Sequence, residues 1–102
     1  MAIFMRKKTG EKEILRIEAS SFLGDGALYI TSEAIAYEVY GKGIYLNFIP
    51  LKSIKKFNAI TSSLFGARKF RMVWLEDNTE HHFEFRTKKH TQLQNILSTN
   101  FT

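Results

Sequence analysis

The sequence has no cysteine and one proline, Pro50, among its 102 residues. Without cysteine there is no disulfide framework and no thiolate nucleophile or metal ligand. With one proline and no Gly/Ser-rich, repeated or low-complexity segment, nothing divides the chain, so we expect a single domain over residues 1–102. The apolar runs are short and interrupted by charge, which excludes a segment that spans a bilayer.

The N-terminal stretch M-A-I-F-M is too short for the apolar part of a signal peptide, and its cations follow it instead of preceding it. We therefore expect a cytoplasmic protein, placed peripherally at the inner membrane face if its ligand is lipid. The formal net charge of +5 favours anionic partners such as lipid head groups, nucleic acid or acidic peptides. A small basic domain without an anionic partner has the same composition, so charge alone decides nothing.

Patterns that carry chemistry are missing, so we expect no enzyme, no cofactor and no metal site. The segments G-D-G and G-K-G at residues 24–26 and 41–43 are turn signals, because neither continues into the G-K-[ST] of a phosphate-binding loop. No G-x-S-x-G element is present. The three histidines are His81, His82 and His90. The first two are neighbours on a predicted strand and point to opposite faces, so they cannot hold one metal ion together.

Residues 13–19 alternate apolar and polar side chains, which predicts a half-buried strand. Residues 27–40 predict a hairpin with Ser32-Glu33 at its turn, Ile30 facing Ile35 and Leu28 facing Tyr37. For the next turn we prefer the pair Gly41-Lys42, because it brings apolar residues together. These facing pairs are Val39 with Ile44, Tyr37 with Leu46, and Ile35 with Phe48.

Residues 68–86 give the clearest hairpin, with Asp77-Asn78 at its tip. On one face the predicted pairs are Phe70 with Phe85, Met72 with Phe83 and Trp74 with His81; on the other, Arg71 meets Glu84, Val73 meets His82 and Leu75 meets Glu80. The same register sets Lys69 opposite Arg86, a repulsion that solvent exposure or a bound anion would relieve.

Two segments differ from this pattern. Residues 51–60 have apolar residues every third position, as in a helix, but lack strong helix formers, so an irregular strand fits equally well. After Thr87, a suitable helix cap, the residues Leu93, Ile96, Leu97 and Phe101 form a helical stripe. Antiparallel strands followed by one docked helix predict a mainly β protein, a small barrel or orthogonal sandwich closed by that helix.

Three segments are informative together. G-A-L-Y-I-T-S-E-A-I-A-Y-E at 26–38 is similar to the hairpin motif of GRAM domains, and F-I-P-L-K-S-I-K-K-F at 48–57 resembles a second segment of the same family. E-D-N-T-E-H-H-F-E-F at 76–85, followed by a helix, resembles their C-terminal end. The resemblance covers about residues 11–98. It implies a pleckstrin-homology-like fold, a bent antiparallel β-barrel of about seven strands capped by one C-terminal α-helix. It also implies a non-catalytic binding module for lipid head groups, membranes or proteins.

One departure from that resemblance concerns the ligand. Pleckstrin-homology domains with high affinity for phosphoinositides often have basic residues on both of their first two strands. Here Arg16 is basic, but Leu28-Tyr29-Ile30 supplies no arginine to the second strand. The sequence therefore argues against a specific inositol-phosphate pocket.

The segment T-S-S-L-F-G-A-R-K at 61–69 carries the candidate contact residues Leu64, Phe65, Arg68 and Lys69, with Lys55 and Lys56 as secondary candidates. In one interpretation Leu64 and Phe65 enter a membrane or a partner groove, which gives roughly 1.5–3 kcal/mol each. In another they fold back over the core, and in a third they mediate assembly of a homo-oligomer without a lipid role. The cations would add about 1 kcal/mol each at an anionic surface.

Nucleic-acid binding is the third function considered. Aromatic and basic residues alternate in F-R-M-V-W and F-E-F-R, as in some nucleic-acid-binding sheets. Alternation along a strand places the rings on one face and the cations on the other. Stacking and phosphate contacts would not converge, so the sequence makes nucleic acid an unfavoured partner.

Overall fold

The structure, a computed structural model, describes residues 13–60 and 66–100. The described chain forms strands and one helix in the following order: β1 (Glu13–Ser21), β2 (Gly24–Thr31), β3 (Ala34–Val39), β4 (Gly43–Pro50), a 3₁₀ turn (Leu51–Ser53), β5 (Ile54–Ala59), β6 (Arg68–Glu76), β7 (Thr79–Thr87) and α1 (His90–Asn100). The prediction of a mainly β fold with a C-terminal helix is confirmed.

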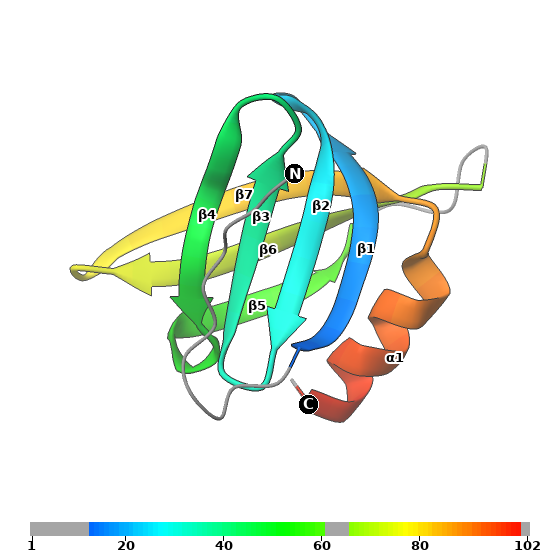
Figure 1. Cartoon of the computed structure of the whole chain (residues 1–102). Helices are drawn as coiled ribbons and strands as arrows, with labels where there is room; N and C mark the ends of the chain where they lie inside the picture. Colours follow the sequence, from blue (N-terminus) through cyan, green and yellow to red (C-terminus); the bar gives the residue numbers. More distant parts are fainter. Residues whose placement is uncertain (1–12, 61–65, 101–102) are drawn as a thin grey trace.

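All seven strands form one antiparallel sheet in the order β4-β3-β2-β1-β7-β6-β5. The sheet bends so that β1–β4 cross in front of β5–β7, as Figure 1 shows. The two parts meet where β1 runs beside β7, with Ser20 paired to Arg86. β4 and β5 are the outer strands and the sheet is not closed between them, so the predicted barrel is a bent, open sheet.

Two predicted hairpins have the expected register. In β2–β3, Ile30 faces Ile35 and Leu28 faces Tyr37. In β6–β7 every predicted pair is present, from Lys69 with Arg86 to Leu75 with Glu80. At the tip, Asp77 and Asn78 have φ values of 54° and 63°, which suit a two-residue hairpin turn. In β6–β7 this register keeps the aromatic residues on one face and most charged residues on the other.

The turn between β3 and β4 differs from the prediction. Val39 faces Gly43, not Ile44, so the loop is the three residues 40–42 and not the Gly41-Lys42 pair. Its closing hydrogen bond runs from the Lys42 N–H to the Val39 carbonyl, 2.9 Å away. The prediction of a two-residue turn was wrong because it required the pairing of β3 with β4 to continue without a register shift.

Two register shifts explain how β4 still presents apolar residues to β3. The first restores the predicted pair of Tyr37 with Leu46. The second sets Ile35 opposite Ile49 instead of Phe48, and Phe48 takes a positive φ of 56°. Extra residues of this kind bend a strand and move side chains relative to the partner strand.

Segment 51–60 contains both structures that its sequence allowed. A single 3₁₀ turn covers Leu51–Ser53, and a strand follows from Ile54. Phe57 of this strand is buried and meets Phe70 and Phe85 edge to face. The helical alternative is therefore wrong beyond Ser53, because the strand places Phe57 in the aromatic core.

The core lies between the two crossed parts of the sheet and is rich in rings. Tyr37, Phe70 and Phe85 are its largest fully buried side chains, and the Phe70 and Phe85 rings stack 5.8 Å apart. From α1, Leu93 and Leu97 are buried in this core, with Ile96 packed against it. Phe101, the last residue of the predicted stripe, lies outside the described residues.

Thr87 connects the sheet to the helix, although not as the predicted helix cap. Its side chain is 2% exposed, and its hydroxyl donates to the Glu18 carbonyl at 2.8 Å. The same oxygen accepts a hydrogen bond from the Lys89 N–H at 3.0 Å, one residue before the helix begins at His90. Thr87 thus joins β1, the end of β7 and the start of α1.

Candidate functional site

The predicted interaction tip, Leu64 and Phe65, lies outside the described residues, which resume at Gly66. Its surroundings are described, because Ile60 and Gly66 border it on either side. The Ile60 N–H donates to the Lys69 carbonyl at 2.9 Å, so the two ends of the segment are held together. The residues around these ends therefore define the candidate site.

Arg68 does not face solvent as a free cation. Its Nη1 donates to Oε1 of Gln94 on α1 at 3.0 Å. Its Nε is buried and makes no hydrogen bond within the described part of the chain. Arg68 therefore ties β6 to α1, and its charge is directed at the helix instead of at an external surface.

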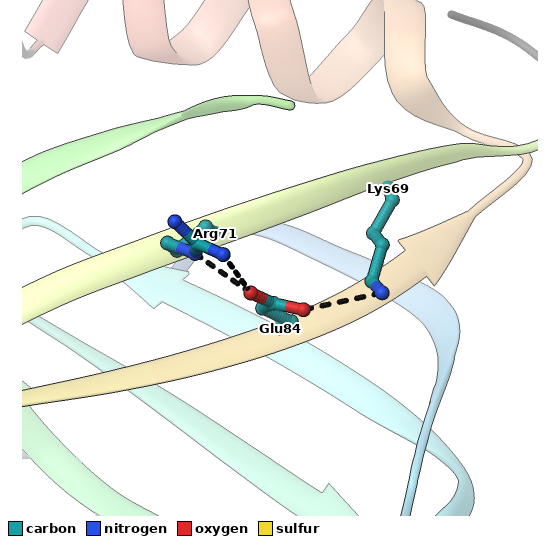
Figure 2. Close-up of polar contacts among 3 residues, drawn as sticks. All are labelled: Lys69, Arg71 and Glu84. Atoms are coloured by element: carbon teal, nitrogen blue, oxygen red, sulfur yellow. Dashed lines mark hydrogen bonds and ion pairs between the residues drawn. The ribbon is translucent and has the colours of Figure 1, made fainter. Parts of the chain in front are cut away.

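Lys69 shares a carboxylate with Arg71, as Figure 2 shows. Lys69 Nζ lies 3.1 Å from Glu84 Oε1, while Arg71 Nε donates to Glu84 Oε2 at 2.7 Å. The hydrogen bonds from Arg71 and then Lys69 lower the pKa of Glu84 below its ordinary value. The repulsion between Lys69 and Arg86 that the sequence predicted is thus eased by a carboxylate of the chain itself.

Lys55 and Lys56 are exposed on β5, far from Lys69. A register shift between Ile54 and Lys56 lies at this point of the strand. Lys56 pairs with Val73, which lies four residues from Lys69 along β6, a distance of about 13 Å. Lys55 and Lys56 therefore do not belong to the same cluster as Lys69.

Three cations that were not among the predicted site residues lie nearer to Lys69 than Lys55 and Lys56 do. Arg86, near the end of β7, and Lys88 and Lys89, just after it, are exposed. With Ala67, they line an open groove of about 520 Å³ whose lining also includes Glu18 and Asp25. The facing pair of Lys69 and Arg86 was the sequence signal for this cluster. We call Lys69, Arg86, Lys88 and Lys89 the basic cluster.

A second groove of about 300 Å³ opens where β1 separates from β7. Its lining residues are Ser20, Ser21, Phe22, Lys69, Glu84, Phe85 and Arg86. It shares Ser20 and Arg86 with the first groove, so the two grooves adjoin at the Ser20–Arg86 pair. It combines hydroxyls, an aromatic wall and two cations with one carboxylate.

Phe22, beside this groove, was missed because its segment reads as a turn. Its side chain is 79% exposed. Its ring meets Tyr45 edge to face at 6.4 Å, and Tyr45 in turn lies 5.3 Å from Phe83. Lys42 Nζ donates to the Leu23 carbonyl at 3.3 Å and links the β3–β4 turn to this one. An exposed aromatic pair, Phe22 with Tyr45, therefore stands at this end of the sheet.

The described residues contain no group of His, Asp or Glu side chains arranged to bind a metal ion. His81 stacks on Trp74 at 5.6 Å between ring centroids. No helix in the described ranges has the length and apolar character required to cross a membrane. Comparison of the chain with protein-family models, curated proteins and solved structures gives no match.

Proposed function

We propose that the chain is a non-catalytic binding module that docks on anionic lipid surfaces, with segment 61–65 and the basic cluster as its contact face. The resemblance of three segments to GRAM domains supports this function, and the bent sheet with its C-terminal helix agrees with the fold that this resemblance implies.

The observation that carries the proposal is the convergence of cations around the ends of segment 61–65. Lys69 follows this segment directly along β6, and Arg86 faces Lys69 from β7. Lys88 and Lys89 border the same groove as Ala67. Positive charge from two parts of the chain thereby gathers at the described end of the segment whose sequence contains Leu64-Phe65.

The expected affinity is modest. Four cations near an anionic membrane contribute about 1 kcal/mol each, and Glu18, Asp25 and Glu84 reduce the sum. Burial of Leu64 and Phe65 would add roughly 1.5–3 kcal/mol each. After the cost of association, a dissociation constant between micromolar and millimolar follows.

Co-sedimentation with phosphatidylserine vesicles tests this function. The double variant Lys88→Glu/Lys89→Glu should weaken binding at least tenfold, since each reversal changes an attraction of about 1 kcal/mol into a repulsion. Lys55→Glu/Lys56→Glu changes net charge equally and is the matched control. Equal losses in both would show a response to net charge alone and overturn the proposed face.

The variant Leu64→Ser/Phe65→Ser tests the apolar part separately. Unchanged binding to anionic vesicles would remove insertion from the proposal. A DNA titration at low salt serves as a second control, because nucleic-acid binding would give a steep salt dependence.

A second candidate function, self-association, is favoured by the exposed ring of Phe22 next to Tyr45. Large exposed aromatic side chains are frequent in protein interfaces. Sedimentation velocity separates the two functions. Assembly would be favoured over lipid binding if the chain forms a dimer that Phe22→Ser dissociates and if the chain does not bind vesicles.

A further inference from the structure

Most of one long edge of β7, from Glu80 to Glu84, pairs with no strand of the described chain. The two-residue turn makes Glu76 and Thr79 a hydrogen-bonded pair, so alternate residues from Glu80 onwards direct their N–H and C=O groups away from β6. These residues are Glu80, His82, Glu84 and Arg86. In the described pairing, β1 meets this side of β7 at Arg86 alone. The backbone of Glu80, His82 and Glu84 therefore has no strand partner there.

This edge differs from the two outer edges of the sheet. β4 carries two register shifts and ends at Pro50, and β5 carries a register shift with exposed Lys55 and Lys56. Both are devices that block addition of a further strand. β7 keeps an unbroken register with β6 from Thr87 to Thr79. Its ladder with β6 therefore has no irregularity that would obstruct pairing on the other side.

The surroundings of the β7 edge select the chemistry of an occupant. An added strand would end where β1 takes over the edge at Ser20, in the groove that also contains Lys69 and Arg86. Glu84 is the one carboxylate lining this groove, and Arg71 shares it. The positive charges of Lys69 and Arg86 are therefore only partly balanced by Glu84, so the groove favours a ligand that brings a further carboxylate. Phe22, on the groove wall, offers an apolar contact.

We propose that the free edge of β7, at Glu80, His82 and Glu84, binds an extended peptide segment as an added strand. Its backbone pairs with β7, an apolar side chain meets Phe22, and a carboxylate meets Arg86. This is strand addition to a sheet, in which backbone bonds give affinity and side-chain contacts give specificity. It shares Arg86 with the basic cluster of the lipid function, but it rests on the backbone edge of β7, which the lipid function does not use.

A second copy of this chain is a poorer occupant than an acidic peptide. If β7 paired antiparallel with β7 of another copy around His82, Glu80 of each copy would face Glu84 of the other. Like charges placed directly opposite destabilise a strand pair. A foreign segment with uncharged residues beside Glu80 and Glu84 and one carboxylate at Arg86 avoids this repulsion.

NMR titration of the full-length chain with three synthetic peptides tests the proposal. All are acetylated: Thr-Val-Thr-Val-Glu amide has a side-chain carboxylate, Thr-Val-Thr-Val acid has a terminal carboxylate, and Thr-Val-Thr-Val-Gln amide has neither. At millimolar peptide, the amides of Glu80, His82 and Glu84 should shift and exchange more slowly with solvent. The neutral peptide should bind at least fivefold more weakly, and the two acidic peptides show which carboxylate fits.

His82→Pro removes the central N–H of the free edge without removing a hydrogen bond to β6, and should abolish these shifts. His82→Thr keeps the N–H and is the matched control. Arg86→Gln should bring the acidic peptides down to the affinity of the neutral one, a readout that remains if the proline variant does not fold.

Three outcomes overturn the proposal: no shift at these amides with any peptide, equal affinity of acidic and neutral peptides, or shifts that depend on protein concentration without peptide. The last would identify a second copy as the occupant. His82→Pro should leave vesicle binding unchanged, so failure of the peptide site and failure of the lipid function are distinguishable.

Discussion

Lys69 and Arg86 occupy directly opposite positions on β6 and β7, and the Lys69 ammonium lies against Glu84, 3.1 Å away. Glu84 also accepts from Arg71, so one carboxylate serves two cations of β6. The basic cluster is therefore partly neutralised from within the hairpin. This arrangement links the stability of the hairpin to its attraction for anions.

The first prediction concerns Glu84→Gln. Because the pKa of Glu84 is lowered from 4.5 in the folded chain, its contribution to stability is complete above that value and is lost as the pH falls through the folded pKa. The variant should be less stable than wild type at pH 7, and the difference should shrink below pH 4.5. Urea unfolding at stepped pH measures this.

The same variant should bind anionic vesicles more tightly. Removing one negative charge beside Lys69 and Arg71 should raise the affinity for an anionic membrane roughly fivefold. Weaker vesicle binding by Glu84→Gln would contradict the placement of Lys69 in the lipid contact face.

The second prediction concerns Gly26, which pairs with Val39 in the β2–β3 ladder. A methyl group at Gly26 would overlap the Glu38 carbonyl oxygen and press on the Tyr37 ring. We expect Gly26→Ala to lower the free energy of unfolding by about 3 kcal/mol, since backbone cannot move aside. Gly41→Ala is the control: its φ is +81° but nothing lies within 4 Å, so a cost of about 1 kcal/mol is expected.

The third prediction concerns the hydroxyl of Thr87. Thr87→Val keeps the shape of the side chain but leaves the Glu18 carbonyl and the Lys89 N–H without their partner. We expect a loss of about 1–3 kcal/mol by urea unfolding. Thr79→Val, at the exposed hairpin tip, should stay within about 0.5 kcal/mol of wild type. Equal effects would show that the loss reflects strand preference and not these hydrogen bonds.

The fourth prediction concerns docking of α1. Leu93 is fully buried in the core, and an isolated helix of 11 residues is marginal in water. Leu93→Ala should cost about 2–5 kcal/mol and reduce helical circular dichroism before the sheet unfolds. Ser98→Ala, on the exposed side, should change stability by about 0.5 kcal/mol at most.

The hairpins were predictable because their two faces differ chemically. Along β6 and β7 the aromatic residues share one side and the charged residues the other, and a slip by one residue would reverse them. The β3–β4 turn was not predictable for the opposite reason. Two register shifts each move the pairing by a residue while keeping apolar residues opposite one another, so the sequence pattern is compatible with more than one ladder.

The candidate site was less accessible to sequence than the fold. The partner of Arg68 is Gln94 on α1, 26 residues further along the chain, and no local sequence pattern predicts a contact over that separation. Phe22 sits in a turn-like segment, and its exposure depends on how β1 separates from β7. The basic cluster could be anticipated in part, because the register of β6–β7 already placed Arg86 opposite Lys69.

In the described chain, a single backbone pair, Ser20 with Arg86, stitches β1 to β7. Because this contact between β1 and β7 is so short, the aromatic rings between the two crossed parts of the sheet govern the spacing of these parts. The chief rings are Tyr37 and Phe83, whose centroids are 4.8 Å apart. Ring size at these two positions therefore acts as a spacer. A smaller side chain at either position should bring the two crossed parts of the sheet closer together while every hairpin keeps its pairing.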